Sequence, residues 1–308
     1  MFFRKKALLT KIETTYATDA LPTGVANAIL CLNVNITPME NEMIDRNREQ
    51  AFFGHQAQLP VNTTVRLDYE VELVGSGTLG TAPAWGPLVR ACAFAETISA
   101  GVSVAYNPIS SAIESVTQYF NLDGVLHKLL GCRGSVSMKI SAKGNPVFAF
   151  KTMGLYGGIS DAVMPTQTLT AWKDSIAVNN ANTSAFALHG YAGKLYDMNI
   201  DLATKLVHRN LVGTEDIQLT DREPAGDIVI EATNIATKDF WTISKAATLG
   251  ALTITHGTVA GYKVKIDAPN VQLINPSYED RDGFAAAKMG LRFMPGSSGN
   301  DELTITSI

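Results

Sequence analysis

The sequence predicts a mainly β protein built from two tandem β-sandwich domains, each with one short helix. Three observations support this prediction. Apolar and charged residues alternate from Val65 to Leu73, which is typical of a strand with one buried and one solvated face. Further short strand-like runs, separated by turn residues, follow it. Finally, the second half of the chain repeats the plan of the first, and 308 residues are enough for two domains, each with its own core.

The repeat is visible in segments of equal length. Residues 116–155 and 252–291 both end in Met-Gly-Leu. Upstream of them, Asn35-Ile36 and Asn199-Ile200 each precede an Arg-Asn pair at almost the same spacing. The order strand, insert, strand, helix and strands recurs in both halves. This agreement in element order supports a duplication more strongly than the shared letters do.

The first half begins with a segment that has no sustained period. Residues 1–27 mix basic residues with Thr, Ala and Pro, so we expect an extended arm that becomes ordered by lying on a neighbouring molecule. A strand at 29–36 then leads into a long polar insert at 39–60. After the charged strand and a glycine-rich loop, apolar residues of 85–94 share one helical face, which predicts a short amphipathic helix. Strands follow at 102–106, 115–122, 125–130, 136–141 and 147–156, with a hairpin turn at Asp123-Gly124.

A linker separates the halves. Residues 157–186 are rich in Gly, Ser, Asp, Thr and Asn, and a short helix is expected near Trp172. The chain ends with Leu303 to Ile308 as an edge strand. The second half contains a strand at 195–201, an insert at 211–226, a strand at 227–232, a helix at 237–247 and strands near Leu252, Val264, Val271 and Met289. The predicted boundaries are 1–27 for the arm, 28–156 for the first domain, 157–186 for the linker and 187–308 for the second domain.

Composition excludes several classes of protein. The formal net charge of −4 argues against a basic nucleic-acid binder, and no apolar run approaches the length of a membrane span. The cysteines Cys31, Cys92 and Cys132 have unrelated spacings, which predicts free thiols in a reducing compartment. The chain is therefore expected to fold in the cytosol.

No set of residues predicts catalysis or a bound cofactor. The run from Gly75 to Gly80 has the spacing of a dinucleotide fingerprint, but it follows a charged strand and precedes Pro83, so we interpret it as a flexible loop. The five histidines are scattered, and Asp280 and Asp282 lie in a turn. No nucleophile, base and orienting group come together. We expect no enzyme activity, no catalytic residue, no cofactor and no metal site.

Two aromatic pairs predict contacts with other molecules. Phe52-Phe53 lies in an otherwise polar insert, and Phe2-Phe3 opens a basic arm. Exposed aromatic pairs at such positions usually mark contact sites, because an interface core gains from large apolar area. The alternative is that both pairs fold back onto their own domain.

Several segments resemble the major tail tube proteins of long-tailed, non-contractile bacteriophages. They are residues 5–30, the stretch 71–97 with its Gly75–Phe94 core, the Asn-Leu-Asp-Gly turn at 121–124 and the terminal 299–308. The resemblance extends over the length of the chain. It implies a tail-tube-type β-sandwich crossed by a helix in each domain, whose inner sheets join those of neighbours into a β-barrel ring.

The resemblance also implies an assembly. Single-domain relatives form hexameric rings and duplicated relatives form pseudo-sixfold trimers, so the repeat predicts a trimer, with a hexamer as the alternative. Rings would stack through the arm and the long insert. Lumen-facing candidates are Arg66, Asp68, Glu70 and Glu72, because an acidic wall does not hold the phosphates of passing DNA. The candidate stacking contacts are Phe2, Phe3, Arg4, Met43, Ile44, Phe52 and Phe53.

The function implied is structural. The tube would serve as the conduit for genome delivery, in the tail of a virion assembled in the host cytoplasm. The implied partners are further copies of the chain, a tape-measure protein, tail terminator and distal tail proteins, and double-stranded DNA that passes without specific binding; no membrane is implied. Alternatives are another virion component, such as a tail terminator or capsid decoration protein, or a carbohydrate-binding β-sandwich. Against the last, all three tryptophans lie near predicted helices rather than on a strand face.

Overall fold

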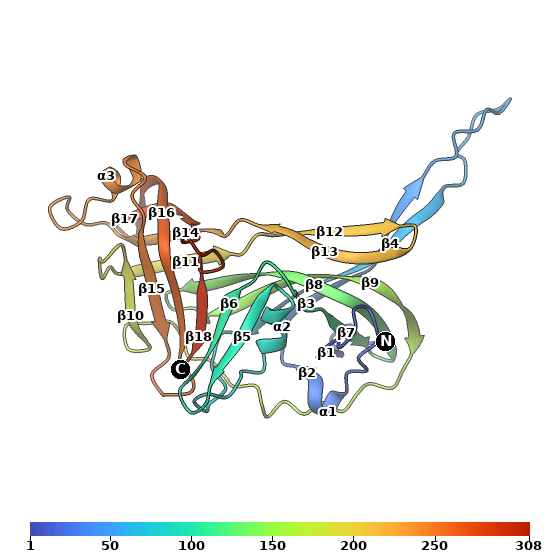
Figure 1. The fold of residues 1–308 in the computed structure, drawn as a ribbon, viewed down its shortest axis with the longest axis horizontal. Helices are drawn as coiled ribbons and strands as arrows, with labels where there is room; N and C mark the ends of the chain where they lie inside the picture. The colour runs from blue at the N-terminus through green and yellow to red at the C-terminus, as the bar shows by residue number, and fades with distance from the viewer.

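The fold is mainly β, as a computed structural model of residues 1–308 shows (Figure 1). One branched antiparallel sheet holds all strands except a separate two-stranded hairpin. The three helices are short, and none is long and apolar enough to cross a membrane. The elements are β1 (Lys6–Ile12), α1 (Gly24–Asn27), β2 (Ala28–Ile29), β3 (Leu32–Ile44), β4 (Leu59–Glu72), α2 (Gly86–Arg90), β5 (Phe94–Ser99), β6 (Ser103–Pro108), β7 (Val116–Leu122), β8 (Val125–Ser141), β9 (Val147–Asp161), β10 (Thr183–Leu188), β11 (Leu195–Asp201), β12 (Thr204–Leu211), β13 (Thr214–Arg222), β14 (Ala225–Glu231), α3 (Phe240–Lys245), β15 (Gly250–His256), β16 (Val264–Arg281), β17 (Phe284–Phe293) and β18 (Thr304–Ser307).

The strands of the two halves follow the same order. In the first half, neighbouring strands run β3, β4, β9, β8, β7, β1. In the second half they run β11, β14, β17, β16, β15, β10. A helix follows β4 in one half and β14 in the other, and a hairpin extends from the first two strands of each. The hairpin β5–β6 and the last strand, β18, fall outside this shared order.

The halves join edge to edge. β11 pairs on one side with β14 and on the other with the last residues of β8. At this junction Met138 faces Ile200 and Ile140 faces Met198, and all four side chains are buried. The expected two separate cores are therefore wrong: a single cluster of 45 buried residues extends through both halves, because the apolar face of the sheet continues across the junction.

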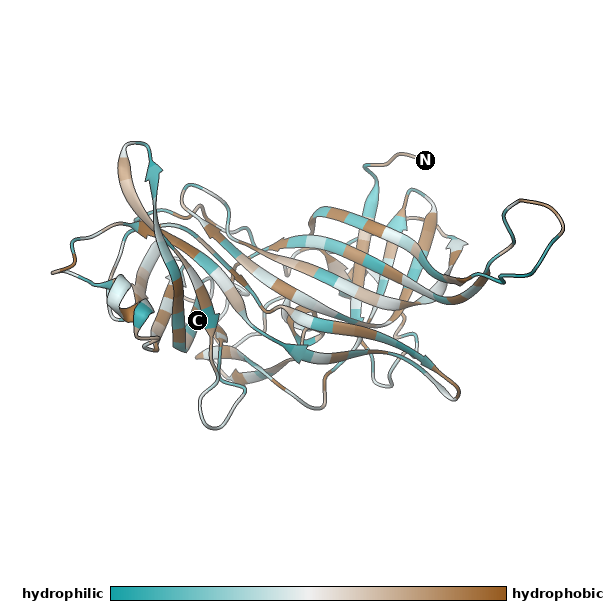
Figure 2. Cartoon of the chain, turned by 90° about the horizontal axis from the view of Figure 1, so that it is seen from above, coloured by the Kyte–Doolittle hydropathy of each residue, from teal (hydrophilic) through white to brown (hydrophobic).

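The alternation predicted for the clearest strand is confirmed in β4. Val65, Leu67, Tyr69 and Val71 are buried, while the charged residues between them lie on the opposite face. Figure 2 shows hydrophobic and hydrophilic residues alternating along the long strands. Each strand thus has one face toward the core and one face available to water or to other molecules.

The hairpin turn at Asp123-Gly124 is also confirmed. It connects β7 to β8, with φ of 37° at Asp123 and 104° at Gly124. Two consecutive positive φ values are what a two-residue hairpin turn of the favoured twist requires.

The N-terminal segment differs from the expected extended arm. Residues 6–12 form β1, which pairs with β7 and β2 of the same chain, and Ala7, Leu8 and Leu9 are buried. Residues 24–27 form the helix α1, which was not predicted. The run Ala7-Leu8-Leu9 was a strand signal concealed by the polar residues around it. Only residues 1–5 remain as an exposed end.

Three other expectations need correction. The C-terminal strand β18 is not an edge strand, because it pairs with β16 on one side and β6 on the other. Strands reach into the expected linker from both sides, and in place of the expected helix the Trp172 N–H closes a single turn by donating to the Leu169 carbonyl oxygen. The glycine-rich loop is packed rather than flexible: a Cβ at Gly75 would lie 2.2 Å from the carbonyl oxygen of Gly261. Glycine is needed there because loops of the two halves touch.

Candidate assembly surfaces

A polar face extends over the sheet on the side opposite the core. We define it by Arg66, Asp68, Glu70 and Glu72 of β4 and the residues beside them on neighbouring strands. Asp68 faces Lys151 of β9, which faces Ser135 of β8. The same face includes Lys139 of β8 and continues across the junction into the second half. There it consists of Asp197, Asn199 and Asp201 of β11, Asp227 of β14, and Lys288 and Arg292 of β17. The four predicted residues therefore belong to one surface that spans both halves.

Two of the cations on the polar face, Lys139 and Arg66, are held by carboxylates. Lys139 Nζ lies 2.7 Å from Glu70 Oε1, and this hydrogen bond lowers the pKa of Glu70 below its usual range. Arg66 donates to Glu40 on the neighbouring strand β3. Glu72 accepts hydrogen bonds from the Asn145 side chain and a backbone N–H. Asp68 is exposed. The surface is thus hydrophilic and of mixed charge, with carboxylates beside two of its cations, while Lys151, Lys288 and Arg292 are exposed and have no ion-pair partner.

The predicted long insert is a β-hairpin that projects from the sheet (Figure 1). Pairing of β3 with β4 continues outward to Ile44 opposite Leu59. Met43 and Ile44 are exposed near the outer end. Residues 45–58 form the tip, where Phe52 is 72% exposed and Phe53 is fully exposed. The structure therefore does not fold these aromatics back onto their own chain.

The N-terminal candidates lie at a different place. The backbone N–H of Phe2 donates to Asp123, and the Lys6 ammonium lies 3.9 Å from the centre of the Phe3 ring. Both rings and Arg4 remain exposed. Figure 1 shows this end well apart from the tip of the β3–β4 hairpin. The predicted contact residues thus form two separate exposed sites on one chain.

A second hairpin, β12–β13, was predicted only as a short insert and lies across the first half (Figure 1). Arg133 of β8 donates to the carbonyl oxygen of Ile217 at 2.8 Å, and the Ile217 N–H donates to the Tyr16 hydroxyl. Burial raises the pKa of Tyr16 to about 12. Within the hairpin, Arg209 donates two hydrogen bonds to Asp216 at 2.8 and 2.6 Å and lowers the pKa of that carboxyl to about 2. The β12–β13 hairpin could have been predicted from Val212-Gly213, which lies between two strand-like runs.

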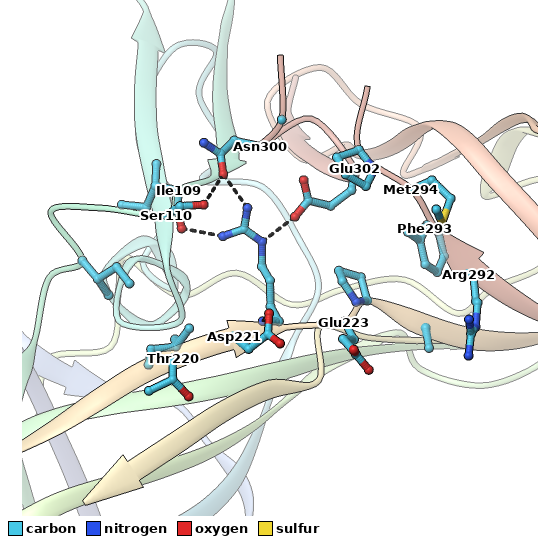
Figure 3. A pocket seen from close by; sticks show the side chains of 17 residues that line it. Ile109, Ser110, Thr220, Asp221, Glu223, Arg292, Phe293, Met294, Asn300 and Glu302 are labelled. Carbon is cyan, nitrogen blue, oxygen red and sulfur yellow. Dashed lines mark hydrogen bonds and ion pairs between the residues drawn. The ribbon is translucent and has the colours of Figure 1, made fainter. Parts of the chain in front are cut away.

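A polar clamp lies beside a cavity of about 600 Å³ at the base of this hairpin (Figure 3). Arg222 at the end of β13 donates to the carbonyl oxygen of Ile109, to Asn300 Oδ1 and to Glu302 Oε1. The Arg222 and Glu302 side chains are only 11% and 5% exposed. The clamp ties together the β6–β7 loop, the base of the hairpin and the C-terminal segment, none of which the sequence placed together.

Several strand edges lack a partner within the chain, including those of β5 and β10, and two others bear on assembly. The inner part of β3 pairs with β4 on one side only. Residues Ser277–Arg281 of β16 pair with β17 on one side only. Beside the second edge, Tyr278 and Phe284 are 62% and 63% exposed. Unpaired edges with exposed apolar residues are templates for pairing with another chain.

Comparison with known proteins gives one family. The family model described as phage tail tube protein matches residues 4–302. No curated protein matches the chain.

Proposed function

Because the chain belongs to the phage tail tube protein family, whose role in the virion tail is structural, we propose that three copies of it form each ring of a tube through which the genome is delivered. The observation that carries the proposal is the shared strand order of the two halves. Each chain then supplies two equivalent tube domains, residues 28–156 and 187–308. Three such chains make a closed ring with six similar positions, and closure removes the unpaired sheet edges.

The polar face is proposed to line the lumen. Its opposite face forms the core, so only the polar face can meet water in a closed barrel. Duplex DNA carries one negative charge per roughly 1.7 Å, and free Lys or Arg side chains along a wall would bind its phosphates. Lys139 is paired with Glu70 and Arg66 with Glu40, and the carboxylates of the polar face outnumber its cations, which include the unpaired Lys151, Lys288 and Arg292; both features reduce that attraction. DNA could then pass without being held.

The exposed N-terminal residues and the tip of the β3–β4 hairpin are proposed to hold successive rings together. Phe2, Phe3, Phe52 and Phe53 supply exposed apolar area, and Arg4 adds charge. Because β12–β13 is the shorter hairpin and is held down on its own chain, only three of the six positions in a ring would carry a projecting tip. The ends of the tube would meet tape-measure, terminator and distal tail proteins.

Electron microscopy of the purified protein in negative stain tests this proposal. We expect hollow cylinders that lengthen with protein concentration, whereas a tail terminator would stop at one ring. A variant with Phe52→Ser and Phe53→Ser should give rings that stack poorly. Val163→Ser, at a side chain that is 93% exposed but outside the proposed contacts, serves as the matched control and should form tubes of normal length. Long cylinders from the double variant would contradict the stacking role of the tip.

A further inference from the structure

We infer that the ring closes by antiparallel pairing of β3 in one copy with Ser277–Arg281 of β16 in the next copy, with Asn35 opposite Glu279. The inference rests on the proposed ring and specifies the contact that closes it. Both segments are the unpaired edges described above.

The junction between the halves provides the template. There, Ser137–Ser141 of β8 pair antiparallel with Asp197–Asp201 of β11. β3 holds the place of β11 in the first half, since each is the outermost strand before β4 or β14. β16 holds the place of β8 in the second half, since each pairs along its first part with β15 or β7 and along its second part with β17 or β9. Neither counterpart of this internal contact pairs with a second strand, although the Val34 carbonyl oxygen of β3 accepts a hydrogen bond from the Lys6 side chain.

The register can be followed from strand to strand, beginning with the outermost pair in each half. Asn35 faces Asp68, and Asn199 faces Asp227. This match makes Asn35 the counterpart of Asn199. In turn, Asp68 faces Lys151 of β9 and Asp227 faces Gly290 of β17. Gly290 is thus the structural counterpart of Lys151 and not of Gly154, so the shared Met-Gly-Leu letters do not mark equivalent positions in the two halves.

The same procedure places β16 against β8. Lys151 faces Ser135, and Gly290 faces Ile274. Two residues back along β9 and β17, Ala149 faces Ser137 and Lys288 faces Ser277, with the β16 bulge between Ile274 and Ser277 supplying one extra residue. Ser277 is therefore the counterpart of Ser137, and Glu279 that of Lys139. Since Lys139 faces Asn199, Glu279 of one copy should face Asn35 of the next.

Tyr278 and Glu279 suit this pairing, whereas Asp280 takes the place of the buried Ile140 and would face Val34 near the end of the contact. Tyr278 would face Ile36, as Met138 faces the buried Ile200 inside the chain. The Tyr278 ring, now 62% exposed, already rests against Trp241 with ring centres 4.9 Å apart. Pairing would cover this apolar surface on the core side. On the polar face, Glu279 and Asn35 would meet as hydrogen-bond partners.

Paired cysteines test the register in assembled tubes. Directly opposite residues of antiparallel strands have Cα atoms about 4.5 to 5.5 Å apart, within the range that a disulfide spans. In a Cys31→Ser background, Asn35→Cys with Glu279→Cys should give disulfide-linked dimers and trimers on a non-reducing denaturing gel. Lys139→Cys with Asn199→Cys, the internal counterpart, should link within one chain and run as a monomer. Asn35→Cys with Ser277→Cys, two residues out of register, should remain unlinked. The register would be overturned if the Asn35–Ser277 cysteine pair formed the disulfide and the Asn35–Glu279 pair did not. It would also be overturned if neither of these two pairs formed a disulfide in assembled tubes.

Hydrogen exchange on wild-type protein gives a second readout that needs no variant. Assembly should protect the amides of residues 33–37 and 277–281, while those of 137–141 are protected before and after. If wild-type tubes form and both edges still exchange as in the free protein, the inference fails and the tube function stands. If the wild type forms no tubes at all, the proposed function itself is contradicted.

Discussion

The Arg222 clamp gives the prediction whose size follows most directly from the structure. Arg222→Met removes the only partner of a carboxylate that is 5% exposed, and one oxygen of Glu302 already lacks a hydrogen-bond partner. Removing one member of a buried ion pair typically costs about 3 to 5 kcal/mol. Because water in the adjoining cavity can solvate part of the unpaired Glu302 charge, we expect the loss in free energy of unfolding to lie at the lower end of this range, about 3 kcal/mol.

Urea unfolding of the unassembled protein, followed by tryptophan fluorescence, measures this loss. A single core through both halves predicts one cooperative transition, so a free energy of unfolding can be extrapolated to water. The double variant Arg222→Met with Glu302→Leu leaves no buried charge and should recover most of the loss. The reasoning is refuted if Arg222→Met lies within about 1 kcal/mol of wild type, or if the double variant is no more stable than the single one.

Three further predictions concern the N-terminus, the packed loop and the second hairpin. Deleting residues 1–5 should leave the fold intact but shorten the tubes seen by electron microscopy, whereas Leu8→Ala should lower the free energy of unfolding by about 2 to 5 kcal/mol, since Leu8 is buried in β1. Equal tube lengths for the truncated and full chains would contradict the first half of this prediction. Gly75→Ala should destabilise by about 1 to 3 kcal/mol in the same urea assay because its Cβ meets backbone, while Gly290→Ala, where the nearest atoms are 3.5 Å away, should change little. Similar losses for both glycine variants would show that close packing is not the cause. The pKa of Asp216 is about 2 in the folded protein and 3.8 otherwise, so its stabilisation of the β12–β13 hairpin should be complete above pH 3.8 and lost as the pH falls through about 2; a carboxyl titration by 13C NMR with its midpoint at 3.8 would refute this.

The local sequence pattern was sufficient to predict a strand where one face of that strand is buried and the other is solvated. The alternation of β4 and the Asp-Gly turn before β8 were predicted from the sequence because each depends on residues close along the chain. The strand at 195–201 was predicted within its observed bounds for the same reason. The polar-face residues of β4 were identified by the same alternation.

Elements that depend on distant partners were not predicted. β1 is buried only because β7 lies beside it, and its apolar run is too short to stand out from the polar residues around it. β18 was expected at an edge because nothing in its sequence shows that β6 of the first half lies beside it. The same holds for the Arg222 clamp, whose acceptors lie 78 to 113 residues away along the chain. Such contacts follow from topology, which local periodicity does not contain.

The central claim is that each chain contributes two equivalent tube domains to a ring. Cryo electron microscopy of the purified protein, with class averages viewed down the tube axis, tests it most directly. The account predicts threefold rings with six similar lobes around a hollow centre. Sixfold rings, with one half of each chain standing outside the wall, would contradict it, because the second half would then be a decoration rather than a second tube domain.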